Sequence, residues 1–79
     1  MRISVAFVLI NVAPMHEHEV YNNLLKTEKI LEVHPLFGEY DLIVKIEINS
    51  FRDLAGFVGD KLKSMRGVLD TKTLTGVEP

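Results

Sequence analysis

The sequence of 79 residues contains no cysteine and no tryptophan, and it has no long hydrophobic run. Without cysteine, the chain can form neither a disulfide to stabilise a small fold nor a thiolate zinc site. The apolar stretch that ends at Ile10 is far shorter than the roughly 20 residues that a membrane-spanning helix needs. It also lacks a small-residue signal-peptidase site after it. We therefore expect a cytoplasmic protein that makes no contact with a membrane.

An excess of positive charge is missing as well. Nine Lys and Arg residues stand against 11 Asp and Glu residues, so the formal net charge is -2 at pH 7. Domains that bind nucleic acid on their own usually carry a strongly basic surface, so we expect no direct binding to DNA or RNA. No linker rich in Pro, Gly or Ser and no tail of like charge divides the chain, so residues 1–79 are expected to form a single domain.

Hydrophobic periodicity predicts six elements. They are strands over residues 3–12, 30–37, 40–48 and 68–77 and helices over residues 15–27 and 50–66. Ser50 is a good N-cap for the second helix, and Asp53 three residues later resembles a capping box. The order strand, helix, strand, strand, helix, strand contains two similar halves. It predicts an α+β fold of the ferredoxin-like βαββαβ type, with an antiparallel sheet.

In this topology the first and third strands are central, and Pro35 in the second strand agrees with an edge position because proline cannot donate to a strand ladder. Right-handed crossovers in the two halves place both helices on one face of the sheet.

The first strand is apolar on both of its faces, which is unusual for a sheet with one solvated face. One face carries Ile3, Val5, Phe7 and Leu9, and the other carries Ala6, Val8, Ile10 and Val12. A domain this small buries only about 60% of its unfolded surface, so an oligomer would supply burial that the single chain lacks. Since Ala6, Val8, Ile10 or their neighbours cannot all face water, we expect the uncovered face to pack against the same face of a second chain in a closed two-fold dimer.

The turn between the second and third strands carries Gly38, Glu39, Tyr40 and Asp41 and is the first candidate site. A carboxylate beside exposed backbone amides can hold the ammonium and carboxylate groups of a small zwitterion. The structural alternative is that Gly38 supplies a positive φ, Tyr40 packs and Asp41 caps backbone amides.

The alternating threonines Thr71, Thr73 and Thr75 lie on one face of the last strand and are candidates for the polar side of a pocket, although strand propensity alone also explains threonine there. The spacing of the three histidines matches no metal or catalytic motif, so we expect no catalytic site, metal or cofactor. The basic group at the C-terminal end of the second helix, Lys61, Lys63 and Arg66, is explained by the helix dipole, which favours cations there.

Three segments resemble the effector domain of the Lrp/AsnC feast/famine regulators, called RAM. They are residues 6–12, 33–45 and 67–73, and Gly-Glu-Tyr-Asp at 38–41 is the most specific part. The resemblance implies the βαββαβ fold, a dimeric α/β barrel and rings of eight or ten subunits. It also implies a stand-alone RAM protein without the family's DNA-binding helix-turn-helix, because the resemblance begins near Met1.

In this family amino acids bind between neighbouring dimers, against the hairpin and the last strand. Carried over by position, the ligand-binding residues are Gly38, Glu39, Tyr40, Asp41, Thr71 and Thr73. The sequence departs from the family pattern at Glu28, Phe37 and Arg66, and the Phe37 phenyl group beside the pocket is expected to affect the ligand most.

Three functions are compatible with these observations. The preferred one is a non-enzymatic amino-acid sensor that modulates transcription, either by sensing its ligand or by associating with full-length Lrp/AsnC regulators. The others are a small monooxygenase of the dimeric α/β-barrel type and a purely structural oligomerisation module. An enzyme should place polar residues between sheet and helices, whereas the expected inward positions are nearly all Ile, Val, Leu and Phe.

Overall fold

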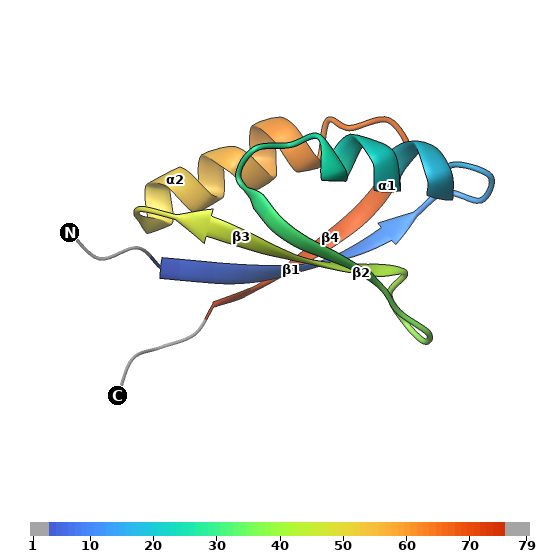
Figure 1. The fold of residues 1–79 in the computed structure, drawn as a ribbon, viewed down its shortest axis with the longest axis horizontal. Coiled ribbons are helices and arrows are strands. Elements are labelled where there is room, and N and C mark those ends of the chain that lie inside the picture. The colour runs from blue at the N-terminus through green and yellow to red at the C-terminus, as the bar shows by residue number, and fades with distance from the viewer. Residues whose placement is uncertain (1–3, 76–79) are drawn as a thin grey trace.

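A four-stranded antiparallel sheet with helices on one face makes up the chain, of which the computed structural model describes residues 4–75 (Figure 1). The elements, in chain order, are β1 (Ser4–Val12), α1 (Glu17–Leu25), β2 (Ile30–Pro35), β3 (Leu42–Ile48), α2 (Phe51–Gly56), the π-helical segment η1 (Phe57–Leu62) and β4 (Val68–Thr75). All six predicted elements are present. The expected extensions of the first strand to Ile3 and of the last strand to Val77 fall outside the described residues.

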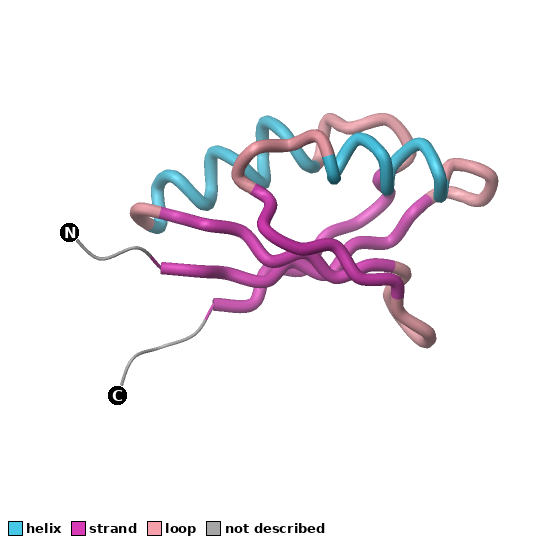
Figure 2. Tube along the Cα trace, in the orientation of Figure 1, coloured by secondary structure: helices cyan, strands magenta, loops and turns pink. Residues whose placement is uncertain are grey.

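The strand order is β2-β3-β1-β4, which confirms the ferredoxin-like arrangement with β1 and β3 in the centre. Every pairing is antiparallel, and Val8 of β1 pairs with Val44 of β3 on one side and with Thr73 of β4 on the other. Pro35 is the last residue of the edge strand β2, as its missing N–H group predicted. Figure 2 shows both helical segments on the same side of the strands.

The hydrophobic core lies between the sheet and the helices. Every buried side chain among the described residues is apolar, as the sequence predicted for the inward positions. The sheet contributes Ala6, Val8, Ile10, Val12, Val33, Leu42, Val44, Ile46 and Ile48, and the helices contribute Val20, Leu24, Leu54, Val58 and Leu62. Burying each large aliphatic side chain stabilises the fold by about 1.5–3 kcal/mol, so this layer is the main source of stability.

The opposite face of the sheet is uncovered in the single chain and carries apolar side chains. Val5 is 40% exposed, Phe7 39% and Leu74 42%. The sequence left open which face of the first strand is uncovered. Ala6, Val8 and Ile10 are fully buried beneath the helices, so the uncovered face is the one that carries their neighbours Val5 and Phe7. A strand that is apolar on both faces has no polar alternation to indicate which face is inside.

The first helix is shorter than the periodicity indicated. Met15 was expected inside it, but its backbone has a φ of 75°, which no α-helix contains. The helix therefore begins at Glu17, and it ends at Leu25 rather than at Thr27.

The second helix begins as predicted but does not continue as one α-helix. The Ser50 Oγ atom accepts a hydrogen bond from the Asp53 amide at 3.0 Å, while the Asp53 carboxylate accepts the Asn49 amide at 3.3 Å. After Gly56 the backbone changes to π-helical hydrogen bonding, and the helical residues end at Leu62 instead of residue 66.

The Asp53 carboxylate also ties this helix start to the segment before β2. Lys29 Nζ donates to both of its oxygens, at 2.7 and 2.6 Å. The hydrogen bond from Lys29, followed by the one from the Asn49 amide, lowers the pKa of Asp53 below its usual value.

Gly67 allows the two crossover loops to approach each other. Its φ is +94°, and a Cβ atom added there would lie 2.8 Å from both His16 Cβ and Val20 Cγ2. Its carbonyl oxygen accepts a hydrogen bond from the Ala13 amide at 2.7 Å. The loop after β1 and the loop before β4 are therefore fixed together against the start of α1.

We predict that Gly67→Ala lowers the free energy of unfolding by about 2–4 kcal/mol. A non-glycine residue held in the left-handed region costs about 1–3 kcal/mol, and the added methyl group overfills a contact that is already close. Urea denaturation measures the change. Gly56→Ala is the control, because its added Cβ meets nothing within 4 Å, and it should leave stability equal or raise it by about 0.5–1 kcal/mol. Equal midpoints for the two variants would contradict the close approach at Gly67.

We predict that Lys29→Met raises the pKa of Asp53 toward its ordinary value, measured from the carboxyl carbon shift in an NMR titration. In the native chain this carboxylate has a lowered pKa in the folded state, so its stabilising contribution is present above the ordinary Asp range and is lost as the pH falls through the folded value. Arg52→Met, on the neighbouring exposed position, should leave the Asp53 titration unchanged.

Candidate ligand-binding site at the base of the hairpin

The hairpin between β2 and β3 is closed at Asp41 and attached there to the end of β1. The Leu36 amide donates to the Asp41 carbonyl oxygen at 2.8 Å, and the Asp41 amide donates to the carbonyl oxygen of Ile10 at 3.0 Å. Within the turn, Gly38 has a φ of +124°, as the sequence predicted. These bonds hold Asp41 at a defined place beside β1 while the turn projects beyond the sheet.

The Asp41 side chain caps a backbone amide, which confirms the structural reading of this residue. Its Oδ2 atom accepts a hydrogen bond from the Val12 amide at 2.7 Å. The pairing of β1 with β4 shifts register between Asn11 and Val12, an irregularity at which a strand amide needs another partner. Within residues 4–75, no hydrogen bond reaches the second carboxylate oxygen, Oδ1, so it remains available to a ligand.

A cavity of about 490 Å³ lies between this base of the hairpin and α1. Its lining combines an apolar part with polar groups at α1 and the hairpin: Val12, Tyr21, Pro35, Leu36 and Leu42, together with Glu17, His18, Asn22 and Asp41. The volume falls within the range of about 300–1,000 Å³ that is typical of small-molecule sites. A carboxylate at the edge of an apolar cavity suits an ammonium group attached to an apolar side chain, and His18 and Asn22 offer donors for an anionic group.

The residues that α1 contributes to this cavity were not predicted from the sequence. The apolar spacing of the sequence predicted a helix here but no role for its outward side chains. A signal was present, because Glu17 and Tyr21, like His18 and Asn22, are separated by four positions and so lie on one face of a helix.

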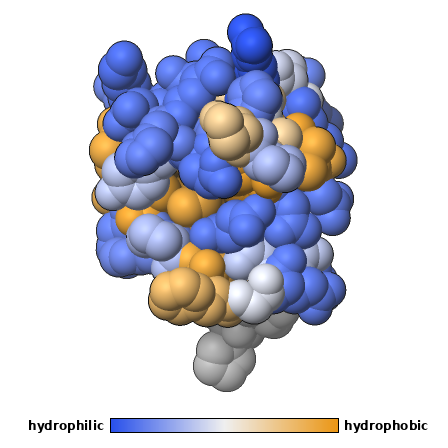
Figure 3. Space-filling view, turned by 90° about the vertical axis from the view of Figure 1, so that its right-hand side faces the viewer, coloured by the Kyte–Doolittle hydropathy of each residue, from blue (hydrophilic) through white to orange (hydrophobic). Residues whose placement is uncertain are grey.

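The other candidate residues of the hairpin do not line this cavity within one chain. Gly38 and Glu39 are exposed in the turn, and Tyr40 is half-buried. The Phe37 phenyl group, the residue that departs from the family pattern, is fully exposed at the tip. Figure 3 shows the end of the molecule at which this turn lies, where apolar patches interrupt the hydrophilic surface.

The two threonines lie on the other side of β1 from Asp41. Thr71 pairs with Ile10 and Thr73 with Val8, so both face the helix side of the sheet. Thr71 lines a separate cavity of about 250 Å³ with Lys63, Val68, Leu69 and Asp70. A single chain therefore does not gather the six predicted site residues into one pocket.

Across residues 4–75, no group of three or more His, Asp or Glu side chains is placed to hold a metal ion. Over the same residues, no helix is long and apolar enough to cross a membrane. His34 lies 2.8 Å from Glu32 on the uncovered face of the sheet, and the hydrogen bond from His34, with that from Lys45, lowers the pKa of Glu32.

Comparison with known proteins shows to which protein family the chain is similar. A family model described as the Lrp/AsnC ligand binding domain matches residues 5–77. Among curated relatives, the HTH-type transcriptional regulator FL11 of Pyrococcus abyssi (strain GE5 / Orsay) is 41% identical over 69 residues, which cover 87% of this chain and 45% of FL11. The chain spans about half the length of the curated relatives it matches. These relatives are named as transcriptional regulators, a non-enzymatic class.

Solved structures share the fold. The crystal structure of FFRP-DM1 matches with a TM-score of 0.88 and 35% identity, covering 94% of this chain and 99% of that one. The transcriptional regulator NMB0573 from Neisseria meningitidis, solved as a complex with L-Met, matches with a TM-score of 0.86 over 95% of this chain and 50% of that one. At 22% identity the second likeness shows the fold alone. The match over residues 5–77 and the identity to FL11 lead to one conclusion: the chain belongs to the Lrp/AsnC family and carries its ligand-binding domain.

Proposed function

We propose that this chain is an oligomeric, cytoplasmic regulatory module that binds an amino acid and modulates transcription. The observation that carries the proposal is the free Oδ1 atom of Asp41 at the edge of a cavity that is large enough for an amino acid and apolar on one side. The family model, described as a ligand binding domain, supports the binding of a small ligand, and the structural neighbour NMB0573 was solved as a complex with L-Met.

In the proposed complex the ammonium group of the amino acid binds Asp41, and its side chain packs against Tyr21 and Leu36. The backbone around Gly38 and Glu39, with Tyr40, contacts the ligand from a neighbouring copy, as the family resemblance implies. Thr71 and Thr73 also contact the ligand from a neighbouring copy. This arrangement explains why one chain alone does not bring the six residues together.

A second copy of the chain is the proposed occupant of the uncovered face of the sheet. The face has an apolar centre formed by Val5, Phe7, Leu9, Ile43 and Leu74. Beside it, Glu32 accepts from Lys45 at 3.3 Å and lies 2.8 Å from His34. Two such faces related by a two-fold axis cover each other's apolar centre and leave the charged groups at the rim, the usual anatomy of an interface. Dimers then assemble into rings of eight or ten.

In this proposal the effect on transcription depends on the bound ligand and on which proteins the chain associates with. The chain acts on transcription through its ligand or by joining full-length regulators of the same family, without binding DNA itself. A structural oligomerisation module that binds no ligand is the second candidate, favoured by the fact that Thr71 and Asp41 line different cavities in one chain.

We predict that at least one of the twenty amino acids raises the thermal midpoint of the native chain. A ligand at a hundredfold excess over its dissociation constant adds about 2.7 kcal/mol of stability. Asp41→Asn keeps an oxygen acceptor for the Val12 amide but removes the charge, and it should weaken binding by about tenfold or more. Asp60→Asn, an exposed carboxylate in η1, is the control and should bind as the native chain does. Binding by no amino acid would leave the oligomerisation module as the better proposal.

We predict that the native chain is at least a dimer at micromolar concentration. Phe7→Lys should shift it toward the 9.0 kDa monomer, because the dimer would bury the new ammonium group in its interface without a partner. Light scattering on a sizing column measures both masses. Phe51→Lys places the same charge on an exposed apolar residue at the start of α2 and should leave the mass unchanged. A native chain that elutes as a clean monomer would rule out the dimer.

A further inference from the structure

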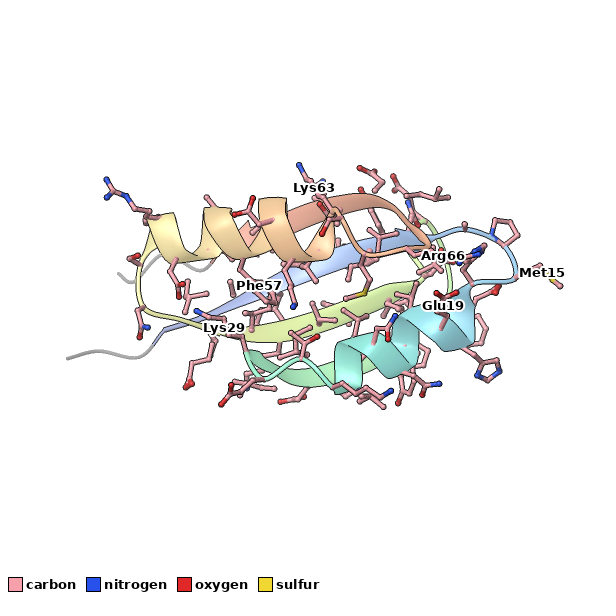
Figure 4. The ribbon with its side chains drawn as sticks, turned by 90° about the horizontal axis from the view of Figure 1, so that it is seen from above. Met15, Glu19, Lys29, Phe57, Lys63 and Arg66 are labelled. Atoms are coloured by element: carbon pink, nitrogen blue, oxygen red, sulfur yellow. The ribbon has the colours of Figure 1, made fainter. Side chains whose placement is uncertain are left out.

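A second groove crosses the helix layer, away from the Asp41 cavity. It has a volume of about 660 Å³ and lies between the end of α1 and η1. Its lining consists of Asn23, Lys26, Thr27, Glu28, Lys29, Phe57, Lys61, Ser64, Met65 and Arg66. Figure 4 looks down on this layer, with Phe57 between the two helices and Lys63 on the opposite side of η1. None of these residues belongs to the amino-acid site proposed above.

The groove is basic, although the chain as a whole is acidic. Four cationic side chains and one carboxylate line it, whereas the chain has a net charge of -2. Lys29 is neutralised by Asp53, and the Arg66 Nε atom lies 3.9 Å from Glu19 Oε2. Within residues 4–75, Lys26 and Lys61 have no carboxylate oxygen within 4.0 Å. Two lysines without a carboxylate partner, one directly after α1 and one in η1, therefore line the same groove.

Helix dipoles do not account for this arrangement. A cation near a helix C-terminus is stabilised by the dipole wherever it lies around the helix axis. Lys63 follows η1 directly and satisfies this requirement while lying outside the groove. The dipole thus explains why the sequence places Lys61, Lys63 and Arg66 at this end but not why Lys61 and Arg66 meet Lys26 across the groove. Convergence of cations from two elements favours an anionic ligand.

The floor of the groove indicates what the anion is attached to. Phe57 and Met65 are partly buried and pack against the hydrophobic core. The neighbouring hydroxyl groups are already used, since Thr27 Oγ1 donates to the Asn23 carbonyl oxygen at 2.8 Å and Ser64 Oγ donates to that of Asp60 at 2.6 Å. The remaining features are cations and an apolar surface beside an aromatic ring. Inorganic phosphate would fill only a small part of the space.

We propose that this groove binds a nucleotide. Its phosphate groups lie against Lys26, Lys61 and Arg66, and its base lies against Phe57 and Met65. Charge supplies the attraction for the phosphates, and the apolar floor supplies the preference for a nucleotide over a bare phosphate chain, because base–aromatic stacking tolerates any base.

Isothermal titration of the full chain at low salt tests the proposal with four probes: ATP, AMP, adenosine and inorganic triphosphate. We expect ATP to bind most tightly, AMP more weakly because it carries fewer charges, and triphosphate about tenfold more weakly than ATP because it lacks the base. Adenosine, which has no charge to offer, should bind least. Triphosphate binding as tight as that of ATP would overturn the nucleotide assignment, and so would absence of ATP binding at millimolar concentration.

Matched variants test the place of binding. Lys61→Gln should weaken ATP binding by about tenfold, whereas Lys63→Gln, which removes the same charge two residues away and outside the groove, should change it less than twofold. Equal losses would mean diffuse attraction to a basic surface and would overturn the site. Phe57→Leu should weaken ATP but not triphosphate. If that variant does not fold, the comparison of ATP with triphosphate on the native chain still decides the role of the base.

Discussion

The structure depends on a central strand that is apolar on both faces. β1 pairs with β3 on one side and with β4 on the other, so it has no free edge and both of its faces lie in the middle of the sheet. One face is buried completely beneath the helices, with Ala6, Val8 and Ile10 at zero exposure. The other face keeps Val5 and Phe7 partly exposed, in a domain that is too small to bury all of its apolar surface alone. The helix layer and the proposed partner copy both follow from the need to cover this one strand.

The end of β1 determines where the candidate site forms. At the register shift after Asn11, the Val12 amide turns to the Asp41 carboxylate, and the next residue, Ala13, bonds to Gly67. The hairpin and the loop before β4 are thereby attached to one short stretch of chain. Asp41 uses one oxygen for this attachment and retains the other, so the structural and the ligand-binding readings of this residue are compatible rather than exclusive.

Local signals in the sequence predicted local features well. Ser50 caps its helix, Pro35 lies at an edge and Gly38 takes a positive φ, because each depends on the chemistry of one residue and its neighbours. The inward face of β1 could not be predicted, since a strand with two apolar faces contains no pattern that distinguishes them. The π-helical hydrogen bonding after Gly56 was missed because it leaves the apolar spacing of Leu54, Val58 and Leu62 unchanged.

The cavity beside Asp41 and the basic groove were not predicted for a different reason: both combine α1 and the residues directly after it with distant segments. Glu17, His18 and Tyr21 line the first, whereas Asn23 and Lys26 line the second. Val20 and Leu24 are the buried residues of this nine-residue helix, with Tyr21 packed against the core, so a ligand at either end acts on an element with few buried contacts. Any displacement of α1 that one ligand favours changes the lining of the other site. Linkage then requires the effect of an amino acid on nucleotide affinity to equal the effect of the nucleotide on amino-acid affinity.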